Sequence, residues 1–296
     1  MKILCPRLPL VTRQEKDSMK TQFPPKLALG AVVVAAALIL GACGSSSSDS
    51  SKSDASTTTA APKTLKIVVT NDDGYDSDGL NAITEALRAQ PNVEVTVVAP
   101  ATQQSGKGGT VTGGTLSATD LKTKGGYPVK AVAGTPADAM IWAIDQKGID
   151  FTPDFVVSGI NAGANLGPVV DLSGTVGAAR AAVQRGIPAM ATSNGALAGP
   201  FAFTESAKIV IEWFTKNRDA IANGTIDKTQ VFNLNIPTCS TGAVRGEVVV
   251  PISTTDNSFL SKQPDCLSTV AAPNNDVGAY MVGFAALSML NAKPAA

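Results

Sequence analysis

The chain contains no histidine, and only 16% of its 296 residues are charged. Without histidine there is no Ser-His-Asp or Cys-His triad, no phosphohistidine and no imidazole-ligated zinc site. A bound metal must therefore be held by oxygen, which favours Mg²⁺, Mn²⁺ or Ca²⁺. A general base must be a carboxylate, a lysine or a water ionised by a metal.

The chain also has no excess of charge of either sign, because its formal net charge is +0. Without a basic surface to neutralise phosphates, polymeric nucleic acid is not an expected partner. A small anionic ligand remains compatible with this composition, because a metal can supply the positive charge locally. The hydrophobic content of 44% is enough to bury a full core in one or two domains.

The N-terminal part has the features of an export signal. Lys20 and Lys26 precede the apolar stretch 27–40, which is short for a membrane span but typical of a signal peptide. The stretch ends in Leu40-Gly41-Ala42-Cys43, which resembles the lipobox of bacterial lipoproteins, where the cysteine carries a lipid. We expect residues 1–43 to be such a signal. The alternative is an ordinary signal peptide whose cysteine is incidental.

This interpretation sets the domain organisation and the location. A signal of ordinary shape would begin at Met19, and we therefore expect residues 1–18 to be an over-extended gene start. Residues 44–63 are mainly Ser, Thr, Asp and Ala, as in a disordered tether. Residues 64–296 then form the functional domain. We expect the protein to be exported and anchored to the cell membrane or envelope through lipid on Cys43.

Two of the four cysteines, Cys239 and Cys266, lie in the functional domain. An exported protein matures in an oxidising compartment, so a disulfide between them is expected. The alternative is two separate buried thiols.

Apolar runs alternate with amphipathic stretches along the domain. We expect strands in the run 65–74 and at 95–99, 129–132, 155–158, 189–192, 231–235 and 244–250. We expect helices from 77 or 78 to 90, from 136 to about 146, from 175 to 185 and from 204 to 217. This alternation predicts an α/β fold with a mostly parallel sheet and helices on both faces. Helical periodicity fades beyond Val231, which indicates a smaller β-rich C-terminal extension.

Asp72 and Asp73 follow the first apolar strand directly and precede a glycine. Two carboxylates about 4 Å apart repel by roughly 4 kcal/mol at an effective dielectric constant near 20. A cation between them would remove this cost, and open α/β sheets bind ligands at this carboxyl edge. The alternative is a solvated turn.

Loops rich in oxygen and glycine follow the second and fourth strands too. They contribute the Ser105 hydroxyl beside Gly106, and the amides of Asn161 and Asn165. Together with the two aspartates, a hydroxyl and an amide oxygen form a plausible site for a hard cation. Glycines let backbone N–H groups approach a phosphate, and Ser173-Gly174-Thr175 opens a helix whose N-terminus can face it.

At this point the sequence resembles the SurE family of nucleotidases, the stationary-phase survival proteins. The motifs that carry the resemblance are Ile67–Gly74, Gly79-Leu80, Val98–Pro100, Gln104–Gly106, Gly134–Asp138, Pro153–Asn161, Gly163–Gly167, Ser173–Val176, Gly186–Ala189 and Phe232–Pro237, with a faint echo at Asp276–Phe284. They occur in the family's order and span nearly the whole domain.

The resemblance implies a Rossmann-like domain whose C-terminal extension builds homodimers or homotetramers. It implies hydrolysis of nucleoside 5′- or 3′-monophosphates to nucleoside and phosphate, with one divalent cation per subunit. The implied cation ligands are Asp72, Asp73, Ser105 and Asn161, the set that the residues themselves suggest. Either aspartate could act instead as base or nucleophile. The remaining phosphate contacts are assigned to backbone N–H groups and to Asn71, Gly106, Asn165, Ser173, Gly174 and Thr175.

Some features depart from the family pattern. Family members are usually cytoplasmic, Leu172 replaces a common aromatic residue, and the C-terminal extension is shorter. Two alternatives to the hydrolase follow. One is a binding lipoprotein that keeps the fold without catalysis, although all four implied ligands are present. The other is an α/β transferase, against which the chain shows no Gly-x-Gly-x-x-Gly after its first strand.

Overall fold

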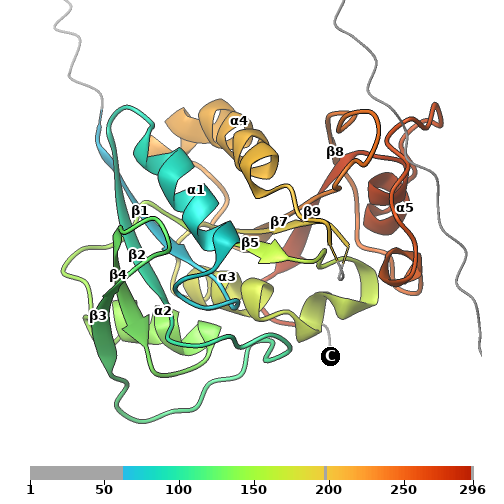
Figure 1. Cartoon of the computed structure of the whole chain (residues 1–296). Coiled ribbons are helices and arrows are strands. Elements are labelled where there is room, and N and C mark those ends of the chain that lie inside the picture. Colours follow the sequence, from blue (N-terminus) through green and yellow to red (C-terminus); the bar gives the residue numbers. More distant parts are fainter. Residues whose placement is uncertain (1–62, 197–198, 295–296) are drawn as a thin grey trace, which may run out of the picture. The chain divides into compact units, whose positions relative to one another are not determined.

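A computed structural model describes residues 63–196 and 199–294 (Figure 1). The strands are β1 (Leu65–Thr70), β2 (Val93–Pro100), β3 (Ala118–Lys122), β4 (Pro128–Val132), β5 (Phe155–Ala162), β6 (Ala189–Asn194), β7 (Gln230–Ile236), β8 (Glu247–Val249) and β9 (Ala285–Asn291). The helices are α1 (Asp78–Arg88), α2 (Pro136–Ile144), α3 (Gly174–Val183), α4 (Phe203–Ala222) and α5 (Asp276–Met281), with 3₁₀ helices η1 (Gly167–Leu172) and η2 (Ser258–Leu260). The predicted α/β alternation is confirmed.

All the strands form one sheet in the order β3-β4-β2-β1-β5-β6-β7-β9-β8. The six central strands from β4 to β7 are parallel, whereas β3 and β9 run antiparallel to their neighbours β4 and β7. The carboxyl ends of the parallel strands therefore meet at one edge, as expected for a ligand-binding α/β sheet.

Helices cover both faces of the sheet, which explains the continuous apolar runs in the strands. Ile67 and Val69 of β1 pack in the core under α1 and α4, whereas Val68 packs in the core under α2 and α3. Figure 1 shows the two helix pairs on opposite sides of the sheet. A capping box begins α2, because the Thr135 side chain accepts from the Asp138 N–H and the Asp138 side chain accepts from the Thr135 N–H.

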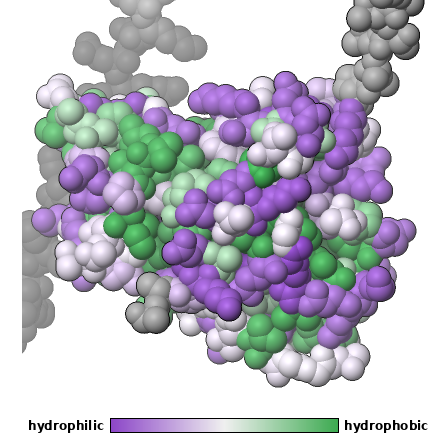
Figure 2. All heavy atoms as spheres, turned by 180° about the vertical axis from the view of Figure 1, so that it is seen from behind, coloured by the Kyte–Doolittle hydropathy of each residue, from purple (hydrophilic) through white to green (hydrophobic). Residues whose placement is uncertain are grey.

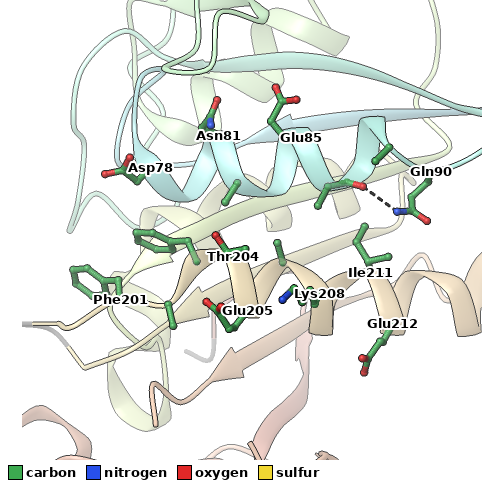
Figure 3. Close-up of a pocket in the computed structure, with 16 residues that line it drawn as sticks. Asp78, Asn81, Glu85, Gln90, Phe201, Thr204, Glu205, Lys208, Ile211 and Glu212 are labelled. Carbon is green, nitrogen blue, oxygen red and sulfur yellow. Dashed lines mark hydrogen bonds between the residues drawn. The ribbon is translucent and has the colours of Figure 1, made fainter. Parts of the chain in front are cut away.

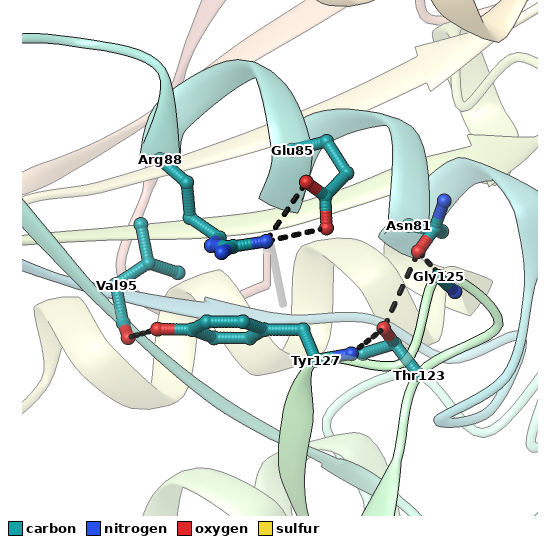
Figure 4. A network of polar contacts seen from close by, with 7 residues as sticks. All are labelled: Asn81, Glu85, Arg88, Val95, Thr123, Gly125 and Tyr127. Carbon is teal, nitrogen blue, oxygen red and sulfur yellow. Dashed lines mark hydrogen bonds and ion pairs between the residues drawn. The ribbon is translucent and has the colours of Figure 1, made fainter.

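The edge strand β3 was not predicted, because its pattern is mostly polar and its side chains are largely exposed. The β3–β4 hairpin is held to α1 and β2 by contacts that Figure 4 shows. Asn81 Oδ1 of α1 accepts from the Gly125 N–H at 2.7 Å, and the Tyr127 hydroxyl donates to the Val95 carbonyl at 2.6 Å. The Arg88 guanidinium lies 4.1 Å from the centre of the Tyr127 ring. These contacts fix the hairpin at the β3 edge of the sheet, on the opposite side of β1 from β5.

The C-terminal extension completes the main sheet with β8 and β9. Between these strands the chain forms η2, α5 and long irregular stretches, and neither β9 nor α5 was predicted. Cys239 and Cys266 form a disulfide with Cα atoms 5.7 Å apart, as expected. Several apolar side chains of this segment are exposed, among them Val249, Leu267 and Val270. Seen from behind, the side of the molecule that carries the extension presents hydrophobic surface (Figure 2).

The expected signal at 1–43, with Cys43, and the tether up to residue 62 lie outside the described residues, so these interpretations stay predictions. Among the residues that the structure does describe, no helix has the length and apolar character needed to cross a membrane.

Candidate functional site

Asp72 lies in the turn after β1, against the N-terminus of α3. Its Oδ1 accepts a hydrogen bond of 2.5 Å from the Thr175 hydroxyl, and only 3% of the residue is exposed. A Cβ on Gly174 would lie 2.8 Å from Asp72 Cβ and 2.9 Å from its Oδ2. A residue without a side chain is therefore required for α3 to begin this close to the carboxylate.

Asp73 faces the end of the neighbouring strand β5. Its Oδ2 accepts a hydrogen bond of 3.0 Å from the Ala162 N–H, which places the carboxylate beside Asn161. The Asn161 Nδ2 donates to the Gly163 carbonyl at 2.6 Å, so the Asn161 Oδ1, on the opposite side of the amide, is directed away from that carbonyl. Three of the four implied cation ligands thus lie on two paired strand ends, β1 and β5.

The fourth implied ligand, Ser105, lies in the exposed loop after β2. The Gln104 N–H donates to the Asp72 carbonyl at 2.7 Å, so the loop is joined to the turn of the aspartates. The Ser105 hydroxyl itself accepts from the Gln103 side chain and bonds neither carboxylate. The structure therefore brings the Ser105 loop to the site, with its hydroxyl engaged by a neighbour.

Both carboxylates are costly to ionise in this position. Burial raises the pKa of Asp72 from 3.8 to about 6, an effect opposed by the Thr175 hydrogen bond and reinforced by the charge of Asp73. Burial also raises the pKa of Asp73, against the lowering effect of the Ala162 N–H. Within the described residues, neither carboxylate forms an ion pair with a lysine or arginine.

These features fit a divalent cation. Two adjacent buried carboxylates without a basic partner leave negative charge that a cation would neutralise. In the part of the chain that the structure describes, no group of three or more His, Cys, Asp or Glu side chains is placed to hold a metal ion. A cation here would therefore rest on the two aspartates together with neutral amide and hydroxyl oxygens, all of which are hard donors.

The residues assigned to phosphate occupy different positions around the aspartates. The Asn71 Nδ2 donates to Gly74 O and Ser77 Oγ, so this buried amide shapes the turn. Ser173 caps α3 by accepting from the Val176 N–H at 3.1 Å, and its own proton stays available. The Thr175 proton is instead donated to Asp72. Gly106, at φ +76°, lies in an open part of its loop, with no atom near the position that a Cβ would take.

Asn165 belongs to a buried polar cluster beside the site. Its Nδ2 donates to Ser193 Oγ at 2.9 Å, its N–H donates to Asn235 Oδ1, and its carbonyl accepts from Asn233 and Asn235. This role of β7 was not predicted from the sequence. The signal was the pair of asparagines two positions apart, which places both amides on one face of a strand.

A groove of about 920 Å³ lies elsewhere, between α1 and α4 (Figure 3). It is floored by small and apolar side chains, and none of the implied ligands lines it. Figure 3 shows the carboxylates of Glu85 and Glu212 pointing away from it. The groove therefore lies apart from the candidate site at Asp72 and Asp73.

Comparison with known proteins identifies the family. Residues 67–258 match the family described as Survival protein SurE. The chain is 40% identical over 186 residues to a protein of Pelobacter propionicus named 5'-nucleotidase SurE, covering 62% of this chain and 71% of that protein. A protein of the same name from Methanoculleus marisnigri is 38% identical over 180 residues, with 58% and 67% covered.

A solved structure extends the comparison to the fold. The crystal structure of the SurE protein from Aquifex aeolicus matches with a TM-score of 0.60 and 27% identity, covering 78% of this chain and 94% of that one. The family match spans more than half of the 296 residues and includes both strand ends that carry the carboxylates and the amide. The chain therefore belongs to the SurE family.

Proposed function

We propose that this protein is a metal-dependent nucleotidase that hydrolyses nucleoside monophosphates to nucleoside and phosphate. The observation that carries the proposal is the pair of buried carboxylates, Asp72 and Asp73, with raised pKa values and with no basic partner among the described residues. Relatives that share this part of the chain are named 5'-nucleotidase SurE, which supports the same reaction class here.

In this proposal, Asp72, Asp73, Ser105 and Asn161 hold one Mg²⁺, Mn²⁺ or Ca²⁺ ion. When bound, such an ion would polarise a phosphoryl oxygen and lower the pKa of a water molecule. The Thr175 hydroxyl fixes the orientation of Asp72 through its 2.5 Å bond. Ser105 would have to exchange its Gln103 partner for the ion.

The phosphate would bind at the N-terminus of α3. Backbone N–H groups at a helix N-terminus point towards a bound anion, and the helix dipole favours negative charge there. The Ser173 hydroxyl accepts from Val176 and can donate its proton to a phosphate oxygen. Asn71 and Asn165 would then act by shaping the turn and the neighbouring loop. The pKa of Asp72, about 6, belongs to the metal-free protein, and a bound cation would favour the ionised carboxylate.

We also propose a location, from features of the sequence, and an assembly, from the exposed surface of the extension. The export signal and Cys43 support a lipid-anchored protein outside the cytoplasm. The exposed apolar side chains of the C-terminal extension support a homodimer or homotetramer.

The direct test is phosphate release from nucleoside 5′- and 3′-monophosphates by the purified protein with Mg²⁺, Mn²⁺ or EDTA. We expect release that depends on the metal and is largely lost in Asp72→Asn. If a folded sample released no phosphate with any of the metals, the result would contradict the proposed nucleotidase activity and would favour a nucleotide-binding protein. Calorimetry with the same nucleotides would then measure binding.

A further inference from the structure

The short helix η1 connects the C-terminal extension with the candidate site. Its last residue, Leu172, accepts a hydrogen bond of 3.0 Å from the Gly108 N–H, in the loop that carries Ser105. The next residue, Ser173, caps α3, whose Thr175 bonds Asp72. The position of η1 therefore sets both the Ser105 loop and the start of α3.

Asp276 holds the first residue of η1. This carboxylate is fully buried, and its Oδ2 accepts from the Gly167 N–H at 2.8 Å across 109 residues of sequence. Its Oδ1 accepts from the N–H groups of Ser253 and Val277, at 2.7 and 2.8 Å. All three partners are donors, so each oxygen of the carboxylate is needed as an acceptor.

The packing around Gly167 supports the same connection. A Cβ at this position, where φ is +51°, would lie 2.7 Å from the Asp256 carbonyl and 3.1 Å from a methyl carbon of Val277. Ala164 and Leu166, from the loop before η1, share a small apolar core with Val277 and other residues of the extension. The extension thus encloses the start of η1 on several sides.

The opposite end of η1 is held by an ion pair. The Arg180 guanidinium of α3 lies 2.6 Å from Asp171 Oδ1 and also donates to the Asn291 carbonyl at 3.1 Å. Arg180 is almost fully buried, whereas the Asp171 side chain is 42% exposed. Both ends of η1 are therefore fixed by charged side chains that contact none of the four implied cation ligands.

We propose that Asp276 is a positioning residue for the cation site, acting through η1 on the Ser105 loop and on the N-terminus of α3. This inference rests on the proposed site, and it assigns the C-terminal extension a role within the subunit. Asp276 contacts neither cation nor substrate. Its bond to Gly167 keeps η1 in the position that places the Ser105 loop and the N-terminus of α3 beside Asp72.

The variant Asp276→Asn tests this bond selectively. Asparagine has the same shape and can keep one oxygen on Ser253 and Val277, but it must turn its NH₂ group towards the Gly167 N–H. Two donors then face each other and the bond is lost. Asp265→Asn is the matched control, because Asp265 lies in the same extension and its carboxylate accepts from the local Leu267 N–H at 3.0 Å, with no hydrogen bond to η1 among the described residues.

The readout is the dissociation constant of Mn²⁺, measured by calorimetry on the full-length protein, beside the urea midpoint of unfolding. We expect Asp276→Asn to weaken Mn²⁺ binding about tenfold, the effect of leaving one buried N–H without a partner. Asp265→Asn should leave the constant unchanged. The loss of nucleotide hydrolysis in Asp276→Asn should be recovered at saturating Mn²⁺.

An Asp276→Asn protein that is less stable but binds Mn²⁺ as the wild type does would overturn the proposal. If Asp276→Asn does not fold, Asp171→Asn is the second variant, because it lies at an exposed position and releases the other end of η1. Mn²⁺ binding that is unchanged in Asp171→Asn would overturn the role of η1. Wild-type protein that binds Mn²⁺ but hydrolyses no nucleotide would refute the proposed function alone, because the Mn²⁺ constants still decide the role of Asp276.

Discussion

The replacement Asp72→Asn should stabilise the metal-free protein while removing its activity. In the unfolded chain Asp72 loses its proton near pH 3.8, whereas in the folded protein burial raises its pKa to about 6. At about 1.4 kcal/mol per pKa unit, an ionised Asp72 costs the folded state about 3 kcal/mol. Because the residue is only 3% exposed, solvent screening reduces this cost little.

The sign of the pH dependence follows from the direction of the shift. The folded state binds the proton more tightly, so the contribution of Asp72 to stability is most favourable below about pH 4. It declines as the pH rises to about 6 and stays constant above. Asparagine cannot ionise and keeps an oxygen for the Thr175 hydroxyl. The variant should therefore exceed the wild type by about 3 kcal/mol at pH 7.5 and by little at pH 4.

Urea unfolding in EDTA between pH 4 and 8 measures this difference, with Asp219→Asn on the exposed face of α4 as a control. Parallel pH profiles for the wild type and Asp72→Asn would refute the reasoning. Added Mn²⁺ should reverse the order of stability, because the ion binds the folded wild type and compensates its paired carboxylates.

Three further predictions concern the same region and the extension. Gly174→Ala should reduce turnover at least tenfold with little change in the far-UV circular dichroism, because its Cβ would approach Asp72 Oδ2 to 2.9 Å. Thr175→Val should raise the pKa of Asp72 in the metal-free protein, because the hydroxyl that it removes donates to Asp72 and lowers this pKa, whereas Thr175→Ser should not; urea unfolding in EDTA between pH 4 and 8 measures the shift. Replacing Cys239 and Cys266 by serine should lower the free energy of unfolding by about 2–4 kcal/mol in urea titrations, and reductant should then have no further effect.

The central sheet could be predicted from the sequence because its strands are buried on both faces. A run such as Ile67-Val68-Val69 has no other plausible environment in a chain of this composition. The start of α2 could also be predicted from the sequence, because the capping box at Thr135 and Asp138 is a local signal. The strand-end rule then placed Asp72, Asp73 and Asn161 at one edge of the sheet, and the structure adds that their strands β1 and β5 are neighbours.

The elements that escaped prediction depend on distant partners. The strand β9 contains Ala, Ser, Met and Asn in place of β-branched residues, and it is a strand because it pairs with β7. The contact between Asp276 and Gly167 joins residues far apart in sequence, and no local pattern marks it. For the same reason, the sequence could name Thr175 as a site residue but could not show that its hydroxyl bonds Asp72.

The placement of β9 between β7 and β8 affects how the molecule is made. During synthesis, β7 and β8 leave the ribosome before the strand that joins them, so both expose unpaired edges until β9 follows. A nascent chain in this state is an unfinished sheet, which a chaperone can hold unfolded. The sheet, and with it the full cooperativity of the domain, is therefore complete only after β9 (Ala285–Asn291) has been synthesised.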